Sequence, residues 1–151
     1  MGKRPDSVFR CLVVLVGWSV LSGCAATRSK SSESSPLVVV EQYLAALNRR
    51  DLLMLTAYVT PDVEWYSMVK GERLKELAGR DALRQALTSY FSQNEDTRWS
   101  IEQSMVVEQN IAVRERSEWR AAEGSGERVT LVAYELRDGR IARITYFVDA
   151  P

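Results

Sequence analysis

The sequence contains 151 residues, with 20 basic and 20 acidic side chains, two cysteines and no histidine. This length suits one domain of ordinary size, and the balanced charge excludes the strongly basic surface of nucleic-acid-binding proteins, so we expect no nucleic-acid partner. Without histidine the chain lacks the commonest general base and the commonest metal ligand. We therefore expect no metal site, and nothing in the composition indicates a cofactor.

Residues 1–23 have the pattern of a secretory signal peptide. Basic side chains at the start precede a mostly apolar run, residues 11–23, which is short for a membrane span. The run closes with "LSGC", which resembles the cleavage box of bacterial lipoproteins, where small residues precede a cysteine that is acylated and becomes the new N-terminus. The resemblance implies that Cys24 carries lipid, including palmitate, and holds the protein at a membrane. An ordinary cleaved signal peptide and an uncleaved N-terminal anchor are the alternatives.

The rest of the chain divides into a tether and one domain. Residues 24–36 are rich in serine and hold almost nothing that could enter a core, so we interpret them as the lipidated cysteine and a disordered tether. Residues 37–151 form the domain. The chain without the leader has a net charge of about −2, and apart from the lipidated cysteine it has no thiol for a disulfide. These features indicate a bacterial cell-envelope protein. By resemblance to Gram-negative sorting rules, Ala25 after the cysteine favours the periplasmic face of the outer membrane.

Three helices are predicted in the first part of the domain. Ser35 and Pro36 suit an N-cap and a first helical position, and apolar residues then recur at helical spacing until residues 48–51. Asp51 suits the N-cap of a second helix over residues 52–59, which Pro61 ends. A third helix begins near Asp81, with one apolar face made by Leu83, Ala86, Leu87, Tyr90 and Phe91.

Strands are predicted around and after the third helix. Residues 62–68 alternate well enough for a strand, and residues 71–79 are expected to be a loop or a short helical turn. After the third helix the period changes to two, which predicts a four-strand antiparallel meander with a tight hairpin centred on Asp138 and Gly139. The order predicts an α+β domain whose three N-terminal helices pack on one face of a bent antiparallel sheet.

Several stretches in this order resemble the nuclear-transport-factor-2-like superfamily, which includes SnoaL-like polyketide cyclases and ketosteroid isomerases. The stretches are "VVEQYLAALNRRDL", "TPDVEW", "LAGRDALRQAL" and "LRDGRIARITYFVD", and the resemblance covers residues 37–149. It implies a cone-shaped bent sheet wrapped against the helices, with a pocket in the wide end. A shared fold does not by itself give a function.

The catalytic residues of the isomerases carry over only in part. The resemblance retains Tyr43 as the tyrosine that donates to an enolate oxygen, although a buried aromatic in the helix face is the alternative. The catalytic aspartate falls at Tyr66 or Ser67, and the second oxyanion donor falls at Ala133, and none of these is a carboxylic acid. Loss of a general base costs roughly 10²- to 10⁴-fold in rate, so we expect no isomerase activity.

One carboxylate has the alternation of an inward-facing group. If Ile111 and Val113 face the interior, Glu115 faces it as well, and an inward glutamate in an apolar cone would have a raised proton affinity. It could then serve as a base or as a hydrogen-bond acceptor. The alternative is that the sheet twist brings Glu115 to the rim, where it pairs with an arginine.

The hairpin at residues 138–139 predicts the pairing of the last two strands. A two-residue loop pairs Ala133 with Ile144 and Leu131 with Tyr146, which places all four on the expected pocket face. A filled interior with no cavity is the alternative. The complete expected pocket is Tyr43, Trp65, Tyr66, Ser67, Glu115, Trp119, Leu131, Ala133, Ile144 and Tyr146.

Three functions are compatible with the sequence. The first is a lipid-anchored envelope domain that binds a small hydrophobic ligand or a protein partner without turnover. The second is a SnoaL-like enzyme of cyclase, isomerase or hydrolase type, with Glu115 as base and Tyr43 or Tyr146 as donor. The third is a structural homodimer that pairs through the outer sheet face, where Arg114, Arg116, Glu118 and Arg120 alternate with the inward residues.

Overall fold

The computed structural model describes residues 35–94, 96–121 and 124–148. The predicted signal peptide, Cys24 and nearly all of the predicted tether lie outside the described residues. No helix in the described part of the chain is long and apolar enough to cross a membrane.

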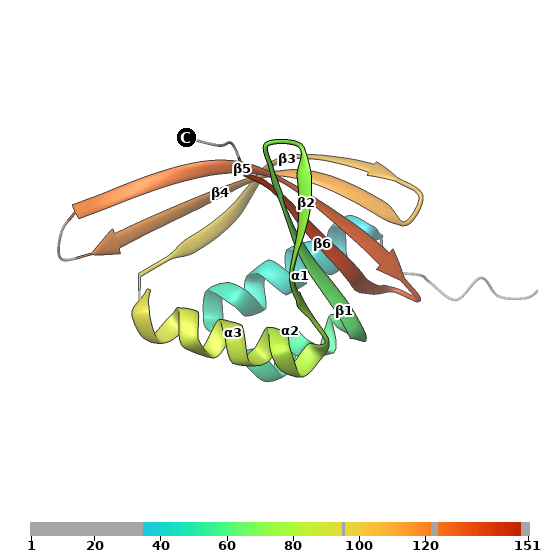
Figure 1. The fold of residues 1–151 in the computed structure, drawn as a ribbon, viewed down its shortest axis with the longest axis horizontal. Helices are drawn as coiled ribbons and strands as arrows, with labels where there is room; N and C mark the ends of the chain where they lie inside the picture. The colour runs from blue at the N-terminus through green and yellow to red at the C-terminus, as the bar shows by residue number, and fades with distance from the viewer. Residues whose placement is uncertain (1–34, 95, 122–123, 149–151) are drawn as a thin grey trace, which may run out of the picture. The chain divides into compact units, whose positions relative to one another are not determined.

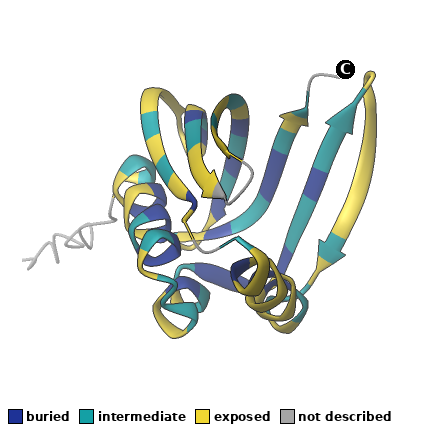
Figure 2. Cartoon of the chain, turned by 90° about the vertical axis from the view of Figure 1, so that its left-hand side faces the viewer, coloured by how far each residue is buried: buried dark blue, intermediate teal, exposed yellow. Residues whose placement is uncertain are grey.

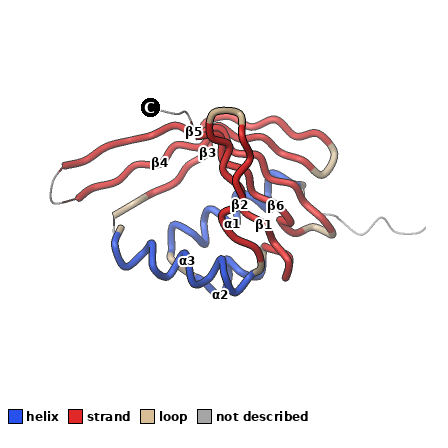
Figure 3. Tube along the Cα trace, in the orientation of Figure 1, coloured by secondary structure: helices blue, strands red, loops and turns tan. Residues whose placement is uncertain are grey.

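The described residues form an α+β domain in which three helices pack on one face of a curved sheet, as predicted, and the sheet has six strands, one more than expected. The helices lie together on one side of the sheet, under its concave face (Figures 1 and 3). The elements are α1 (Pro36–Arg49), α2 (Leu52–Ala57), β1 (Val59–Val69), β2 (Glu72–Ala78), α3 (Arg80–Gln93), β3 (Arg98–Val107), β4 (Asn110–Ala121), β5 (Gly124–Arg137) and β6 (Arg140–Val148).

Local signals explain the first two helices. Pro36 occupies the first turn of α1, where its fixed φ suits the helix and its missing N–H is no loss. Ser35 is at the N-cap position of α1, as predicted, although its side chain makes no capping hydrogen bond. Asp51 caps α2 as predicted, because its carboxylate accepts a hydrogen bond from the Met54 N–H at 3.0 Å.

The sheet differs from the predicted one in two ways. Its strand order is β2-β1-β6-β5-β4-β3, and β3 to β6 form the predicted meander. However, β2 is a strand where a loop or helical turn was expected, and β1 pairs with β6 in parallel, so the sheet is mixed. Nearly every β2 side chain is exposed, so this edge strand has no alternating apolar pattern to reveal it. The parallel pair arises because the last strand enters between β1 and β5.

The β5–β6 hairpin has the predicted turn but a different register beyond it. Asp138 and Gly139 both have positive φ, as a two-residue hairpin turn requires. Leu136 then pairs with Ile141, but Glu135 pairs with Arg143, so one additional β6 residue, Ala142, forms a bulge.

This bulge makes the predicted pairs of the last two strands wrong. Tyr134, not Ala133, pairs with Ile144, and Val132, not Leu131, pairs with Tyr146. A shift by one residue moves every β5 side chain to the opposite face relative to β6.

The core lies between the helices and the concave face of the sheet, where the buried segments face one another (Figure 2). Among the helices, α1 contributes the most buried apolar side chains to this core. Helix α3 contributes only three, because its Ala86 and Tyr90 are not buried. The sheet side of this core is made by Val59, Val63, Ile111, Val113, Val132, Tyr134, Leu136, Ile141 and Ile144.

Asn48 joins the end of α1 to the start of β3. Its side-chain nitrogen donates to the Trp99 carbonyl at 2.8 Å, and the Trp99 N–H donates to its side-chain oxygen at 2.8 Å. The pair of hydrogen bonds holds the backbone of Trp99 at the rim of the concave face.

We expect Asn48→Ala to lower the free energy of unfolding by about 1–3 kcal/mol, because it leaves two partly buried backbone groups of Trp99 without partners. Urea denaturation followed by tryptophan fluorescence would measure the change. Gln42→Ala, at an exposed position of the same helix, is the matched control. Equal effects of the two substitutions would contradict this assignment.

Candidate functional site

Glu115 lies on the concave face of β4, in line with Ile111 and Val113. The residue is 2% exposed, whereas its neighbours Arg114 and Arg116 point to the outer face and pair with Glu102. The alternative of a rim glutamate paired with an arginine is therefore wrong.

Two tyrosines from neighbouring strands hold the Glu115 carboxylate. The Tyr134 hydroxyl on β5 donates to Oε2 at 2.7 Å, and the Tyr146 hydroxyl on β6 donates to Oε1 at 3.1 Å. Tyr134 and Tyr146 share a face only because of the bulge at Ala142. In the register predicted from the turn alone, Tyr134 would point to the outer face.

Further aromatic rings surround this group. Tyr43, from α1, is buried and packs edge-to-face against Tyr134, with ring centroids 6.1 Å apart. Trp65, from β1, stacks on Tyr146 with centroids 5.1 Å apart and an interplanar angle of 17°. The carboxyl group thus lies in an aromatic environment built by one helix and three strands.

The surroundings favour the protonated form of each group. Burial raises the pKa of Glu115, and the hydrogen bonds from Tyr134 and Tyr146 only partly oppose that rise. Burial, together with the negative charge of Glu115, also raises the pKa of Tyr43, Tyr134 and Tyr146. The tyrosines therefore stay hydroxyl donors, and Glu115 is the acidic group of the cluster, with a pKa above its usual value.

A pocket opens beside Glu115, here called the Glu115 pocket. Its volume is about 500 Å³, which is within the range of small-molecule sites, so the interior is not completely filled by side chains. Its polar lining groups include Glu115, Tyr146 and Ser117. The complete lining is Trp99, Glu115, Ser117, Arg128, Val129, Thr130, Tyr146, Phe147 and Val148.

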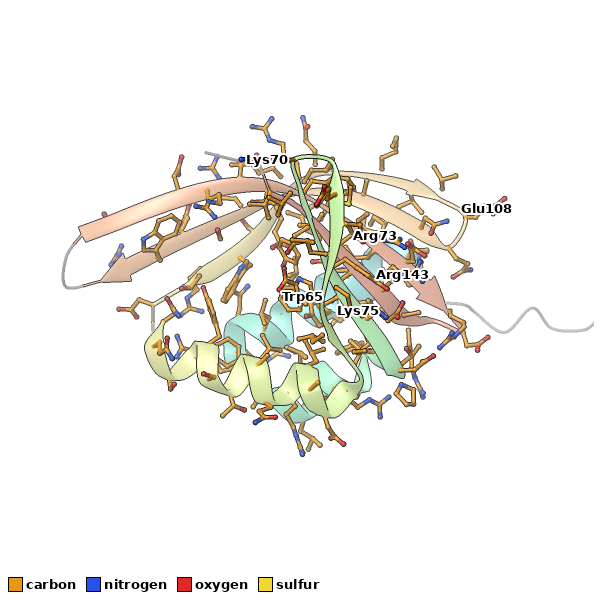
Figure 4. All side chains as sticks on the ribbon, in the orientation of Figure 1. Trp65, Lys70, Arg73, Lys75, Glu108 and Arg143 are labelled. Atoms are coloured by element: carbon orange, nitrogen blue, oxygen red, sulfur yellow. The ribbon has the colours of Figure 1, made fainter. Side chains whose placement is uncertain are left out.

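Tyr66 lies outside this site. It is buried but does not belong to the core cluster, and its ring centroid is 4.6, 5.4 and 5.7 Å from the charged groups of Arg73, Lys75 and Arg143. Figure 4 shows these three basic side chains near one another. Alternation along β1 instead places Trp65 and Ser67 on the concave face. Ser67 pairs with Tyr146 of β6. None of these three β1 side chains supplies a carboxylate.

Three other expected pocket residues also lie elsewhere. Leu131, 49% exposed, and Ala133 are on the outer face of β5, because of the shifted register. Trp119 lies further along β4, where it lines a separate polar groove and covers Gly126 so closely that a Cβ there would be 2.5 Å from the indole ring. Ile144 is on the concave face but is packed into the core.

The sequence analysis missed Tyr134, Trp99 and Arg128. The apolar alternation of Val132, Tyr134 and Leu136 would have identified Tyr134, but we gave priority to the turn-based register.

Among the described residues, no group of three histidine, cysteine or acidic side chains could hold a metal ion.

The raised pKa of Glu115 predicts a pH-dependent stability. The folded protein holds this proton more tightly than the unfolded chain does, in which the pKa of the glutamate is near the usual 4.5. The contribution of this proton to the free energy of unfolding is therefore complete below about pH 4.5. It is lost as the pH rises through the folded-state pKa. We expect Glu115→Gln to remove this pH-dependent contribution. The difference in unfolding free energy between the variant and the wild type should therefore shift in favour of the variant as the pH rises above about 4.5.

Denaturation of both proteins between pH 4 and pH 8 would measure this difference. Glu118→Gln, at an exposed position of the same strand, should follow the wild-type pH dependence. Parallel curves for wild type and Glu115→Gln would contradict the raised pKa.

Solved structures resemble this domain closely in fold. An NTF2-like protein of unknown function from Burkholderia pseudomallei is 20% identical, with a TM-score of 0.62, and the match covers 75% of this chain and 89% of that chain. TerC, co-crystallised with polyporic acid, is 17% identical, with a TM-score of 0.63 and coverage of 75% and 90%. A Mycobacterium tuberculosis protein in complex with estradiol-17beta-hemisuccinate is 17% identical, with a TM-score of 0.63 and coverage of 75% and 93%.

These likenesses support the nuclear-transport-factor-2-like fold. Among curated proteins, none matches this sequence significantly. The SnoaL-like domain family model matches residues 40–144, which include most of α1, the Glu115 strand and most of the meander, and therefore this chain belongs to the SnoaL-like domain family.

Proposed function

We propose that the domain binds a small, flat, hydrophobic molecule in the Glu115 pocket and that Glu115 exchanges a proton with it. The observation that carries this proposal is a buried carboxyl group with a raised pKa at the wall of an open pocket. A buried carboxyl group whose pKa is raised above its usual value holds a proton more tightly than an ordinary glutamate does, and it can accept a proton from a bound molecule and return it.

The walls of the pocket favour a flat apolar ligand. Trp99 lines one part of it and is itself held by Tyr90 and Phe91, whose ring centroids are 5.8 and 6.5 Å from its own. Tyr146 lines another part and is held by the stacked Trp65. Rings fixed in this way offer large apolar contact areas at little cost in side-chain entropy.

The solved relatives support this class of ligand. TerC was crystallised with polyporic acid, and the Mycobacterium tuberculosis protein was crystallised with an estradiol derivative. Both ligands are ring compounds with oxygen substituents, which is the chemistry that an aromatic pocket with one buried carboxyl group would accept.

The proposal includes a proton-transfer step. Ionised Glu115 would take a proton from a carbon next to a carbonyl group of the ligand, leaving an enolate whose oxygen needs a hydrogen-bond donor. Once Glu115 is protonated, Tyr146 is freed to donate to that oxygen. Tyr43 does not line the pocket, so Tyr146 is the better donor of the two considered from the sequence. Return of the proton at another carbon would complete an isomerisation or tautomerisation.

Binding without turnover is the second candidate function. It is favoured by the engagement of both carboxylate oxygens with tyrosines and by the 2% exposure of Glu115, which limits direct contact with a ligand. The lack of acidic residues at the isomerase-like positions in β1 and β5 also favours it.

The bicyclic ketone 2-tetralone is a suitable probe, because it is flat and apolar and has acidic C–H groups beside its carbonyl. We expect the wild-type domain to accelerate deuterium exchange at those carbons, measured by NMR in D₂O. Glu115→Gln should lower the enzymatic rate by roughly 10²- to 10⁴-fold, the contribution of a general base.

The control variant is Glu118→Gln, which should exchange at the wild-type rate. Saturable binding of 2-tetralone without any acceleration of exchange would support binding without turnover. If the domain neither binds the probe nor accelerates its exchange, the ligand class proposed here is wrong.

Lipid on Cys24 would place this domain at a bacterial membrane, and we include that anchoring in the proposal. Its support is the "LSGC" box after the basic and apolar leader. The predicted location is the periplasmic face of the outer membrane in a Gram-negative host.

A homodimer that pairs through the outer sheet face was the third function considered. That face carries mainly charges that are paired within the domain, such as Arg143 with Glu64 and Glu135, which suits solvent as well as an interface.

We expect Cys24→Ser to move the full-length protein from the membrane fraction to the soluble fraction, or to leave it as an unprocessed precursor, in a bacterial host. Cys11→Ser changes the other cysteine and should leave fractionation unchanged. Mass spectrometry of the N-terminal peptide would identify the acyl chains. Mature protein with an unmodified Cys24 would contradict the anchor.

A further inference from the structure

We propose that Arg128 binds an anionic group of the ligand at the mouth of the Glu115 pocket, so that the pocket selects flat hydrophobic acids. This inference rests on the proposed ligand site and specifies which molecules it takes.

The register of the sheet places Arg128 on the same face as Glu115. Thr130 pairs with Glu115 and Arg128 pairs with Ser117, and residues two apart in a strand point to the same face. The Ser117 hydroxyl donates to the Arg128 carbonyl at 3.4 Å, which ties the two strands together at this level. Arg128, Ser117 and Thr130 all line the Glu115 pocket, and the Arg128 residue is exposed.

The charge of Arg128 is available to a ligand. Two other arginines of the sheet are neutralised by neighbours: Arg116 by Glu102 and Glu127, and Arg143 by Glu64 and Glu135. Arg128 has no ion pair with any residue that the structure describes. It is also the one basic side chain in the lining of the pocket, as far as the described residues show.

The two charged groups define the polarity of the ligand. Glu115 is inside, where burial among aromatic rings disfavours an anionic group, whereas Arg128 at the mouth attracts one, so an acidic ligand would enter with its carboxylate or phenolate outward. Two residues along a strand span about 7 Å, and the arginine side chain adds further reach. A molecule with two or three fused rings would connect the two polar ends across the apolar lining.

A matched pair of probes tests this inference: 6-hydroxy-2-naphthoic acid, which is anionic at pH 7, and 6-hydroxy-2-naphthamide, which is neutral. We expect the wild-type domain to bind the acid about two- to fivefold more tightly than the amide in 50 mM salt, as for a partly exposed charge pair. Titration with detection of ligand fluorescence would give both affinities, and the preference should decrease at higher ionic strength.

Arg128→Gln should reduce the ratio of the two affinities to about one without weakening the binding of the amide, and Arg128→Lys should keep part of the preference. The matched control is Arg140→Gln, which removes the same charge from an exposed position at the other end of the β5–β6 hairpin. It should keep the wild-type ratio.

The possible failures are distinguishable. If the domain binds acid and amide equally, or if Arg140→Gln changes the ratio as much as Arg128→Gln does, the role of Arg128 is wrong while the ligand site is retained. If neither compound binds and 2-tetralone does not bind either, the proposed function fails, and this inference fails with it.

Discussion

The site depends on the hydrogen bonds that two tyrosines donate to one buried carboxylate. A buried carboxyl group without partners would cost several kcal/mol, and each charge-assisted hydrogen bond contributes about 1.5–3 kcal/mol. Tyr134 and Tyr146 come from different strands, so both bonds to Glu115 form only when β5 and β6 pair in one register. The bulge at Ala142 sets that register, which makes a single extra residue near the β5–β6 turn important for a site at the far end of the strands.

The two faces of the sheet have different chemistry for the same reason. On the concave face, Glu115 is surrounded by aromatic rings, and burial rather than a cation controls its proton affinity. On the outer face, acidic groups such as Glu64 accept hydrogen bonds from Lys75 and Arg143, and these cations lower the pKa of Glu64. Glutamates on opposite faces of the same sheet are therefore suited to different tasks: proton exchange on the concave face and ion pairing on the outer face.

The pocket combines rigid walls with a polar gradient. Trp99 is fixed by the two hydrogen bonds that its backbone makes with the Asn48 side chain and by the rings of α3, and Tyr146 is fixed by Glu115 and Trp65. Between these walls the polarity changes from the buried carboxyl group to the exposed guanidinium of Arg128. A pocket arranged in this way would orient a ligand before any chemistry occurs, because only one direction of entry satisfies both ends.

The sequence by itself determined the features that depend on local chemistry or on one periodicity. Pro36 and Asp51 indicated where α1 and α2 begin, the period-two pattern indicated the meander, and alternation from Ile111 placed Glu115 on the buried face. The family resemblance correctly indicated the fold and the SnoaL-like membership.

Only the tertiary structure decided which side chains meet. Because of the bulge at Ala142, Tyr134 lies on the concave face at the position that the turn alone would give to Ala133. The exposed strand β2 had no burial pattern that the sequence could reveal. Trp119 continues the inward alternation of β4 but lies beyond the helices, over Gly126, where it lines another groove. Periodicity specifies the direction of a side chain within its own strand, whereas the partner that it reaches depends on register and on the position of the other elements, which are set by packing far away in the sequence.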